Sequence, residues 1–345
     1  MTPRPFVSIV VATHNRRALL AQTLHGLARQ RWPADRLEIL VADNGSTDGT
    51  REVVAHAATR LRPGDGGGPP AHGAAVRYLW VEPPGKSHAV NAALQVTRGD
   101  IVAFTDDDVQ PDPDWIPALV GALEDTHADF VAGRIRPLWA IAPPRWLSPA
   151  LYGVLAIPDN GPARRPITAD TPGRVMPIGA NMAVRASVIA RLGGWRTDLG
   201  KLAGSLRTGE DHEFFLRLLR AGCRGVYEPR ALVGHLVPAA RLERGYVRRW
   251  LHQNGRDVAR IERAYPPAVP FLGGAPRYLW RQLIADAGAT VRAALAGDAA
   301  RRFAAAVRVL WFAGYLRESW FGATGPIAPP SPASPPIART SAEGP

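Results

Sequence analysis

The sequence predicts an α/β fold, with a mostly parallel sheet flanked by helices and a basic, helical C-terminal extension. Through the first 135 residues, short β-branched apolar runs alternate with helical patterns, as they do in βαβ units. The runs SIVVA and EILVA are apolar without interruption, which is typical of strands buried on both faces of a parallel sheet. With 345 residues and 46% hydrophobic content, the chain is long enough to bury a full core.

The elements follow in order along the chain. The predicted strands are apolar runs, at residues 7–12, 37–42, 76–81 and 101–105. The predicted helices show helical spacing of apolar residues, at residues 17–29, 50–61 and 87–96. Between them, residues 62–74 are rich in glycine and proline and predict a surface loop. Residues 137–172 show no clear periodicity, and regular patterns resume at 174–184, 213–221 and 226–234.

The composition changes near residue 241. Residues 241–320 hold 14 arginines against six acidic residues, and the tail that follows is rich in proline, serine and alanine. We therefore expect three parts: an α/β domain over residues 1–240, an arginine-rich helical region over 241–321, and a disordered tail over 322–345.

The net charge is +12, and all but two of the 42 basic residues are arginine, which favours anionic partners such as nucleotides, nucleic acid or a membrane surface. The single cysteine, Cys223, has no partner for an internal disulfide. The apolar run at residues 6–12 is short and leads into a polar segment without a cleavage-like site. The charge-free stretch at 319–338 contains six prolines, which argues against a membrane-spanning helix. These features predict a cytoplasmic location.

The segment 299–318 is predicted to be a basic amphipathic helix. Its apolar residues follow helical spacing, at Phe303, Val307, Leu310 and Trp311, and four arginines share the segment. Such a helix can lie in an anionic membrane interface, so peripheral contact with the cytoplasmic membrane face is one expectation. The alternative is that the helix packs on the α/β domain or on a second subunit.

Asp43 ends the second predicted strand, in the sequence VADNGSTDGT at residues 41–50. Ligands of open parallel sheets bind outside the carboxyl ends of the strands, so this carboxylate is a candidate acceptor of hydrogen bonds from a nucleobase or ribose. Asn44, Ser46 and Asp48 build a turn that caps the next helix. The alternative is a turn and helix cap without a ligand.

Three consecutive carboxylates, Asp106, Asp107 and Asp108, follow the strand at 101–105. Adjacent anions repel one another, and a divalent cation that prefers oxygen ligands removes this penalty. The pattern predicts Mg²⁺ or Mn²⁺, which would also bind substrate phosphates. A solvated acidic loop is the alternative.

Glu210 and Asp211 begin a further predicted helix, in GEDHEFFLRLLRAG at residues 209–222. Acidic residues in a first turn stabilise the helix dipole, and this explanation suffices for the segment by itself. The functional alternative is a general base that faces a pocket.

Taken together, these segments resemble the family 2 glycosyltransferases, which use nucleotide sugars, have the GT-A fold and are generally inverting and metal-dependent. The match covers residues 7–236, with the motifs in the family's order. The resemblance implies that VSIVVATHNR brings Thr13 and Asn15 near the nucleotide, and that VADNGSTDGT brings Asp43 to the base, with Ser46 in the same donor-binding turn.

Two further segments are similar to donor-binding parts of the family. GKSHAVNAAL resembles its Gly-Lys…Asn-x-Gly segment and implies donor contacts from Lys86 and Asn91, although Ala92 and Ala93 replace the usual small-residue pattern. IGANMAVRASVI resembles the lining of the sugar pocket and implies a donor contact from Asn181.

The remaining motifs imply the chemistry. TDDDV resembles the DXD element, with Asp106 toward ribose or metal and Asp108 as a metal ligand. GED resembles the catalytic Glu-Asp element, which makes Asp211 the base, and VGHLVP places His235 where a further metal ligand often stands. From charge alone, Lys86 and Arg241 are candidates for phosphate contacts.

The implied function is inverting transfer of a sugar from a UDP-, GDP- or dTDP-sugar to a hydroxyl acceptor, in the biosynthesis of a glycan, a lipid-linked glycan or a cell-surface polysaccharide. Processive members carry Gln-x-x-Arg-Trp and several membrane-spanning helices. Here residues 246–250 read YVRRW, so a synthase with its own channel is not expected.

Three other functions are alternatives to this one. A nucleotidyltransferase would normally show a glycine-rich basic loop after the first strand, where this chain reads THNRRALL. The charge and the aromatic residues of the C-terminal third would suit a nucleic-acid-binding protein, although no nucleic acid is expected as a partner. A catalytically inactive scaffold would leave the carboxylates unexplained.

Overall fold

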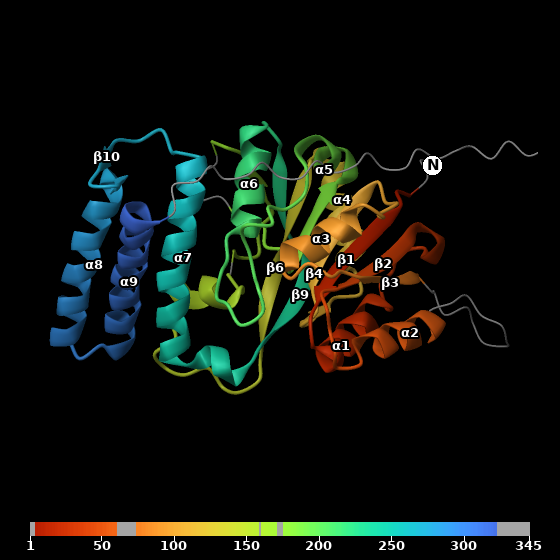
Figure 1. Ribbon diagram of the computed structural model, residues 1–345, viewed down its shortest axis with the longest axis horizontal. Coiled ribbons are helices and arrows are strands. Elements are labelled where there is room, and N and C mark those ends of the chain that lie inside the picture. Colours follow the sequence, from red (N-terminus) through yellow and green to blue (C-terminus); the bar gives the residue numbers. More distant parts are fainter. Residues whose placement is uncertain (1–3, 61–73, 159, 171–174, 323–345) are drawn as a thin grey trace, which may run out of the picture.

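The computed structural model describes residues 4–60, 74–158, 160–170 and 175–322 (Figure 1). Most of the predicted loop at 62–74, and the predicted disordered tail beyond Gly322, lie outside the described residues. A curved sheet with helices on both faces makes up one part of the molecule. Three long helices, α7, α8 and α9, stand side by side at the other end (Figure 1).

The main sheet confirms the α/β prediction. Its strands are β1 (Val7–Thr13), β2 (Leu37–Asp43), β3 (Ala75–Trp80), β4 (Ile101–Asp106), β5 (Val109–Pro111), β6 (Phe130–Trp139), β7 (Arg165–Ile167), β8 (Asn181–Arg185) and β9 (Gly225–Val237). The strand order is β3-β2-β1-β4-β8-β6-β9-β5, and β7 also pairs with β9. The neighbours β3, β2, β1 and β4 are all parallel, and β6 is parallel to β9. β8 runs antiparallel between β4 and β6.

Helices cover both faces of this sheet. The α-helices are α1 (Arg17–Leu27), α2 (Thr50–Arg60), α3 (Lys86–Leu94), α4 (Trp115–Thr126), α5 (Ala186–Leu192), α6 (Glu210–Arg220), α7 (Arg244–Ala264), α8 (Arg277–Leu295) and α9 (Ala299–Phe321). Short 3₁₀ helices are η1 (Ala34–Arg36), η2 (Pro149–Leu155) and η3 (Ala239–Leu242), and β10 (Phe271–Leu272) pairs with β11 (Ala275–Pro276). Apolar side chains of α1, α2 and α4 form a core on one face, and those of α3, α5 and α6 form a second core on the other.

The largest difference from the sequence prediction lies in the middle of the chain. The sequence does not predict β6, because arginine and proline interrupt its apolar pattern. Its long parallel pairing with β9 stabilises this segment as a strand. The regular pattern at 174–184 corresponds to a strand only from Asn181 onward. The helix whose regular pattern covers 213–221 begins at Glu210, as the acidic pair predicted, directly after Gly209, whose φ of 103° is a conformation that glycine adopts readily.

Two glycines set the close crossing of α7 and α9. A Cβ atom on Gly255 would lie 2.0 Å from the backbone oxygen of Trp311, and one on Gly314 would lie 2.0 Å from that of His252. The two backbones therefore touch, and any larger residue at either position would force the helices apart.

The apolar face predicted for residues 299–318 is partly covered by protein, and of its four apolar residues Leu310 stays exposed, at 36%. Phe303 and Val307 are 5% and 0% exposed and belong to the same core cluster as the strands of the sheet. The alternative stated above, packing on the α/β part, is what the structure has. Among the described residues, no helix is long and apolar enough to cross a membrane. Peripheral contact with an anionic membrane stays a prediction.

Candidate active site

The carboxyl ends of β1, β2 and β4 lie at one edge of the sheet. These strands are parallel, and their register pairs Thr13 with Asp43 and Ala12 with Asp106. The side chains that the sequence placed at separate strand ends therefore meet at the edge where open α/β sheets bind ligands.

Asp106, Asp108 and His235 form a group that can hold a metal ion. One ligand atom from each of them lies within 4.8 Å of the others, and His235 Nε2 is 3.3 Å from Asp108 Oδ1. The pairing of β5 with β9 brings the imidazole there, because Val109 stands opposite His235 in the ladder. Two carboxylates and an imidazole suit a divalent cation of intermediate hardness, so the residues fit the metal that the acidic triplet predicted.

Arg16 neutralises part of this acidic cluster. Its Nη1 lies 3.0 Å from Asp107 Oδ1 and 2.8 Å from Asp108 Oδ2, and Thr13 Oγ1 donates to Asp107 Oδ2 at 2.8 Å. Burial raises the pKa of Asp107 to about 6, although the charge of Arg16 opposes that change. Burial also disfavours the Asp108 carboxylate, but the hydrogen bond and charge of His235 and the charge of Arg16 outweigh it and lower its pKa. Asp108 is therefore ionised, with its two oxygens paired with His235 and Arg16.

Lys86, the first residue of α3, connects this cluster to the start of α6. Its Nζ lies 2.6 Å from Asp106 Oδ1. Burial alone would lower the pKa of Lys86, but the negative charges of Asp106, Asp211 and Glu210 raise it above the usual value. The ammonium group therefore stays charged between two acidic sites.

Asp211 is held by two hydrogen bonds. The backbone N–H of Gly179 donates to Oδ2 at 2.9 Å, and Trp195 Nε1 donates to Oδ1 at 3.0 Å. The Trp195 ring is itself fixed, because it stacks on Phe214 with centroids 4.2 Å apart. Burial and the charge of Asp211 raise the pKa of the neighbouring Glu210 to about 7. The Glu210 carboxyl group is therefore partly protonated near neutral pH.

Two loops at the sheet edge are tied to each other. Asp43 Oδ1 accepts from the N–H of Ser46 at 2.9 Å, and Oδ2 accepts from the hydroxyl of Tyr78 at 2.9 Å. Asn15, with φ of 51°, accepts from the N–H of Thr47 through Oδ1, and its own N–H donates to Ser46 Oγ at 2.8 Å. Burial and the hydrogen bond to Asp43 raise the pKa of Tyr78 to about 12. The structure therefore brings the predicted nucleotide-binding residues together.

The amide groups of Asn91 and Asn181 serve the protein interior. Asn91 bonds both the carbonyl and the N–H of Trp195, at 2.6 and 2.7 Å, and so holds the residue that orients Asp211. Asn181 is 1% exposed; its Oδ1 accepts from Trp115 Nε1, and its Nδ2 donates to backbone carbonyls in β6 and β9. A donor-binding role for either side chain has no support from these contacts.

Two more cations stand near the acidic cluster. Arg241 in η3 reaches within 3.8 Å of Asp108 Oδ2, and it lines the same cavity as Lys86 and Lys201. Burial and the charge of Arg241 lower the pKa of Lys201. This concentration of positive charge beside a metal-binding group suits an anionic ligand such as a diphosphate.

Sequence reasoning missed Arg16 and Trp195. Arg16 is one of two arginines directly after the first strand, and the sequence offered no way to tell which of them faces the acidic cluster. Trp195 follows two glycines in a segment without periodicity, and its contact with Asp211 depends on the placement of α6. An indole N–H in a loop near an acidic helix start was the available signal.

The fold and this sheet-edge site are those of the GT-A class of glycosyltransferases. A sequence model described as glycosyl transferase family 2 matches residues 8–192, which is more than half of the chain. The chain belongs to the glycosyl transferase family 2.

Known relatives agree with this assignment. The probable glycosyltransferase YdaM of Bacillus subtilis (strain 168) is 27% identical over 245 residues, which are 69% of this chain and 52% of YdaM. The succinoglycan biosynthesis protein ExoM of Rhizobium meliloti (strain 1021) is 28% identical over 258 residues, which are 74% of each chain. This chain therefore spans about half the length of YdaM and three quarters of ExoM.

A solved structure has a similar fold. The mannosyltransferase PcManGT from Pyrobaculum calidifontis, in complex with GDP-Man and Mn²⁺, is 25% identical to this chain. The TM-score is 0.57, and the match covers 90% of this chain and 88% of that one, so it includes the C-terminal helices as well as the sheet.

Proposed function

We propose that this protein is an inverting glycosyltransferase that moves a sugar from a nucleoside-diphosphate donor to an acceptor hydroxyl. The observation that carries the proposal is the position of Asp211. It is a carboxylate oriented by two hydrogen bonds, and it lines the same cavity as Asp106 of the metal-binding group. Membership of the family supports the reaction class, and the GDP-Man bound by PcManGT supports a nucleotide-sugar donor.

The donor lies along the sheet edge in this proposal. Its nucleoside is placed against the loops after β1 and β2, near Asn15 and Asp43. Hydrogen bonds between Asn15 and both Ser46 and Thr47 connect the two loops. Lys86 and Arg241 are placed beside the diphosphate, because both are next to the acidic cluster and also line the cavity. UDP, GDP and dTDP donors all suit this arrangement.

Asp106, Asp108 and His235 would hold Mg²⁺ or Mn²⁺, with Arg16 fixing the carboxylate of Asp108. A bound cation supplies charge that stabilises the departing diphosphate. The Mn²⁺ found with PcManGT is in keeping with this choice of metal.

Asp211 accepts the proton of the acceptor hydroxyl as that oxygen attacks the anomeric carbon. The N–H groups of Gly179 and Trp195 keep the carboxylate oriented, so that one lone pair stays directed at the acceptor. A base on the acceptor side, with the nucleotide leaving from the opposite side, gives single displacement and inversion. The products would belong to glycan, lipid-linked glycan or polysaccharide biosynthesis.

The test uses the purified chain with UDP-, GDP- and dTDP-sugars and Mn²⁺. A ligand that binds only the folded state raises its melting temperature, so thermal shifts select the nucleotide. Nucleoside diphosphate release, with NMR of the product's anomeric proton, then reports the reaction. We expect one nucleotide to stabilise the protein and the product to be inverted. Retained configuration, or absence of stabilisation and turnover across the panel, would refute the proposal.

A further inference from the structure

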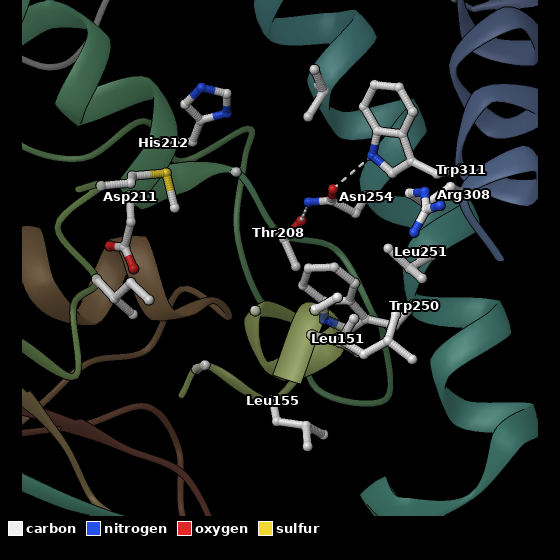
Figure 2. A pocket seen from close by; sticks show the side chains of 18 of the residues that line it. Leu151, Leu155, Thr208, Asp211, His212, Trp250, Leu251, Asn254, Arg308 and Trp311 are labelled. Carbon is white, nitrogen blue, oxygen red and sulfur yellow. Dashed lines mark hydrogen bonds between the residues drawn. The ribbon is translucent and has the colours of Figure 1, made fainter. Parts of the chain in front are cut away.

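Asp211 lines a cavity of about 600 Å³ that extends well beyond the acidic cluster. The cavity runs from Asp106 and Asp211 to the helices α7, α8 and α9, with η2 along its side (Figure 2). The loops that hold Asp43 are not among the residues lining it, so the nucleoside end of a donor lies elsewhere. The far part of the cavity is therefore on the acceptor side of Asp211.

The wall of this far part is apolar. It is formed by side chains from η2 and the three C-terminal helices, among them Leu151, Leu155, Trp250, Leu251, Leu283 and Trp311. Figure 2 shows Leu151, Trp250, Leu251 and Trp311 gathered on the side away from Asp211.

Several polar side chains in this wall are paired with each other. Asn254 accepts from Trp311 Nε1 at 2.9 Å and donates to Thr208 Oγ1 at 3.1 Å, as the dashed lines in Figure 2 show. Asp286 accepts from Arg308 Nε at 2.7 Å. Because these groups bond to one another, they do not need hydrogen bonds from a ligand. The surface that remains in the wall is mostly carbon.

We propose that this wall binds an apolar group attached to the acceptor, so that the substrate is an amphiphile. Its hydroxyl-bearing part lies at Asp211, and its lipid chain or aromatic aglycone lies between η2 and the C-terminal helices. The inference rests on the proposed function, since it takes Asp211 as the base. A free sugar would leave the apolar wall in contact with water, whereas an attached apolar group removes that surface from water.

The first experiment measures binding of methyl, hexyl, octyl and phenyl β-D-glucosides and β-D-mannosides by calorimetry, below their micelle concentrations, with UDP or GDP and Mn²⁺ present. One fully buried CH₂ is worth about fourfold in affinity. We expect Kd to fall at least about 10-fold from methyl to octyl in one sugar series. The octyl and phenyl arms distinguish a lipid chain from an aromatic aglycone. Equal Kd values across both series would overturn the inference.

A pair of glycine variants tests whether the cavity is the binding site. Gly153 lines the cavity, and apart from its chain neighbours a Cβ atom there would meet no described atom within 4 Å, so Gly153→Phe adds a bulky side chain at the cavity wall from an open position. Gly121 on α4 is equally open but lies outside the cavity, so Gly121→Phe is its matched control. In wild type, the octyl glycoside should bind more tightly than the methyl glycoside. We expect Gly153→Phe to reduce this ratio of Kd values to about twofold and Gly121→Phe to leave it unchanged. An unchanged ratio in both variants would place the chain elsewhere.

Two neighbouring residues on α8 allow binding in the cavity to be distinguished from binding at the outer surface. Leu283 lines the cavity, whereas the next residue, Ile284, is 73% exposed and is not among the residues lining it. Leu283→Gln should weaken octyl glycoside binding about 10-fold, with Ile284→Gln as the unaffected control. The opposite pattern would assign the effect to adsorption on the outer face of α8 and would overturn the inference.

Nucleoside diphosphate release in the same preparations keeps the two proposals apart. Normal release with no dependence on chain length refutes the amphiphilic acceptor alone. No release and no binding of nucleotide refute the proposed function as well.

Discussion

Trp195 Nε1 lies 3.0 Å from Asp211 Oδ1 and donates the hydrogen bond that orients this carboxylate. The same indole ring stacks on Phe214, which belongs to the helix that carries Asp211. The aromatic pair therefore couples the position of α6 to the direction of the carboxylate. A loop residue thus controls the geometry of the proposed base.

Trp195→Phe should lower kcat about 10-fold while donor affinity stays the same. The phenyl ring can keep the stack on Phe214, but one hydrogen bond to a charged group is lost, which is worth about 1.5–3 kcal/mol. Steady-state kinetics with varied donor and acceptor concentrations measure the effect. Trp115→Phe is the control, because its Nε1 bonds Asn181 in the core, and it should lower stability rather than kcat. Equal kcat values for wild type and Trp195→Phe would contradict the orienting role.

Asp211→Asn should reduce the transfer rate about 10²–10⁴-fold, the usual contribution of general acid–base catalysis. Binding of donor and metal should survive, because Asp211 is not one of the three metal-binding residues. Single-turnover rates and nucleotide titrations give the two quantities separately. Glu210→Gln should reduce the transfer rate by a smaller factor than Asp211→Asn does. If Glu210→Gln were inactive and Asp211→Asn active, the roles of the two carboxylates would be exchanged.

Asp108→Asn should weaken both Mn²⁺ and donor binding, and EDTA should abolish turnover. The substitution is nearly isosteric, so it reports the loss of charge and of a cation ligand rather than a packing defect. Calorimetric titration with Mn²⁺, with and without nucleotide, measures it. Asp114→Asn is a suitable control, since that side chain is 53% exposed and pairs with Arg31 at the surface. Unaltered Mn²⁺ affinity in Asp108→Asn would remove Asp108 from the metal site.

Glu210 should make the stability of the fold depend on pH. Burial and the charge of Asp211 raise its pKa from 4.5 to about 7 in the folded protein. Between these values the folded state binds more protons than the unfolded state, so this contribution to stability is lost as pH rises from about 4.5 to 7. Glu210→Gln removes the dependence. Urea unfolding at pH 5 and pH 8 measures the free energy of unfolding of both proteins. Relative to wild type, the free energy of unfolding of the variant should be higher at pH 8 than at pH 5 by up to about 3 kcal/mol. Parallel pH profiles would contradict the raised pKa.

Gly314→Ala should destabilise the protein by about 1–3 kcal/mol, as other overpacked sites do. Its Cβ would lie 2.0 Å from the backbone oxygen of His252, so α9 would have to move away from α7. Gly121→Ala is the opposite case, since the helix position is open and alanine favours helix by about 1 kcal/mol. Denaturant unfolding of both variants checks the pair. A stabilised Gly314→Ala would show that the two helices do not cross as closely as described.

The amino-acid pattern alone predicted which strand ends share one edge of the sheet and which acidic side chains lie there. The alternation of strands and helices predicts parallel neighbours, and parallel strands present their carboxyl ends at the same edge. This reasoning placed Asp43 and Asp106 together correctly, and the register confirms it. The acidic triplet similarly pointed to a metal-binding group, since neighbours in sequence at a strand end stay neighbours in space.

Only the tertiary structure decided the contacts between distant segments. His235 reaches Asp108 through the pairing of β5 with β9, and Trp195 reaches Asp211 through the packing of α6, although neither pair is close in sequence. The same holds for the helix at 299–321, where periodicity revealed an apolar face but not what covers it. Phe303 and Val307 pack into the protein core. Packing against protein and insertion into a membrane both remove an apolar face from water, so the sequence pattern is the same in the two cases.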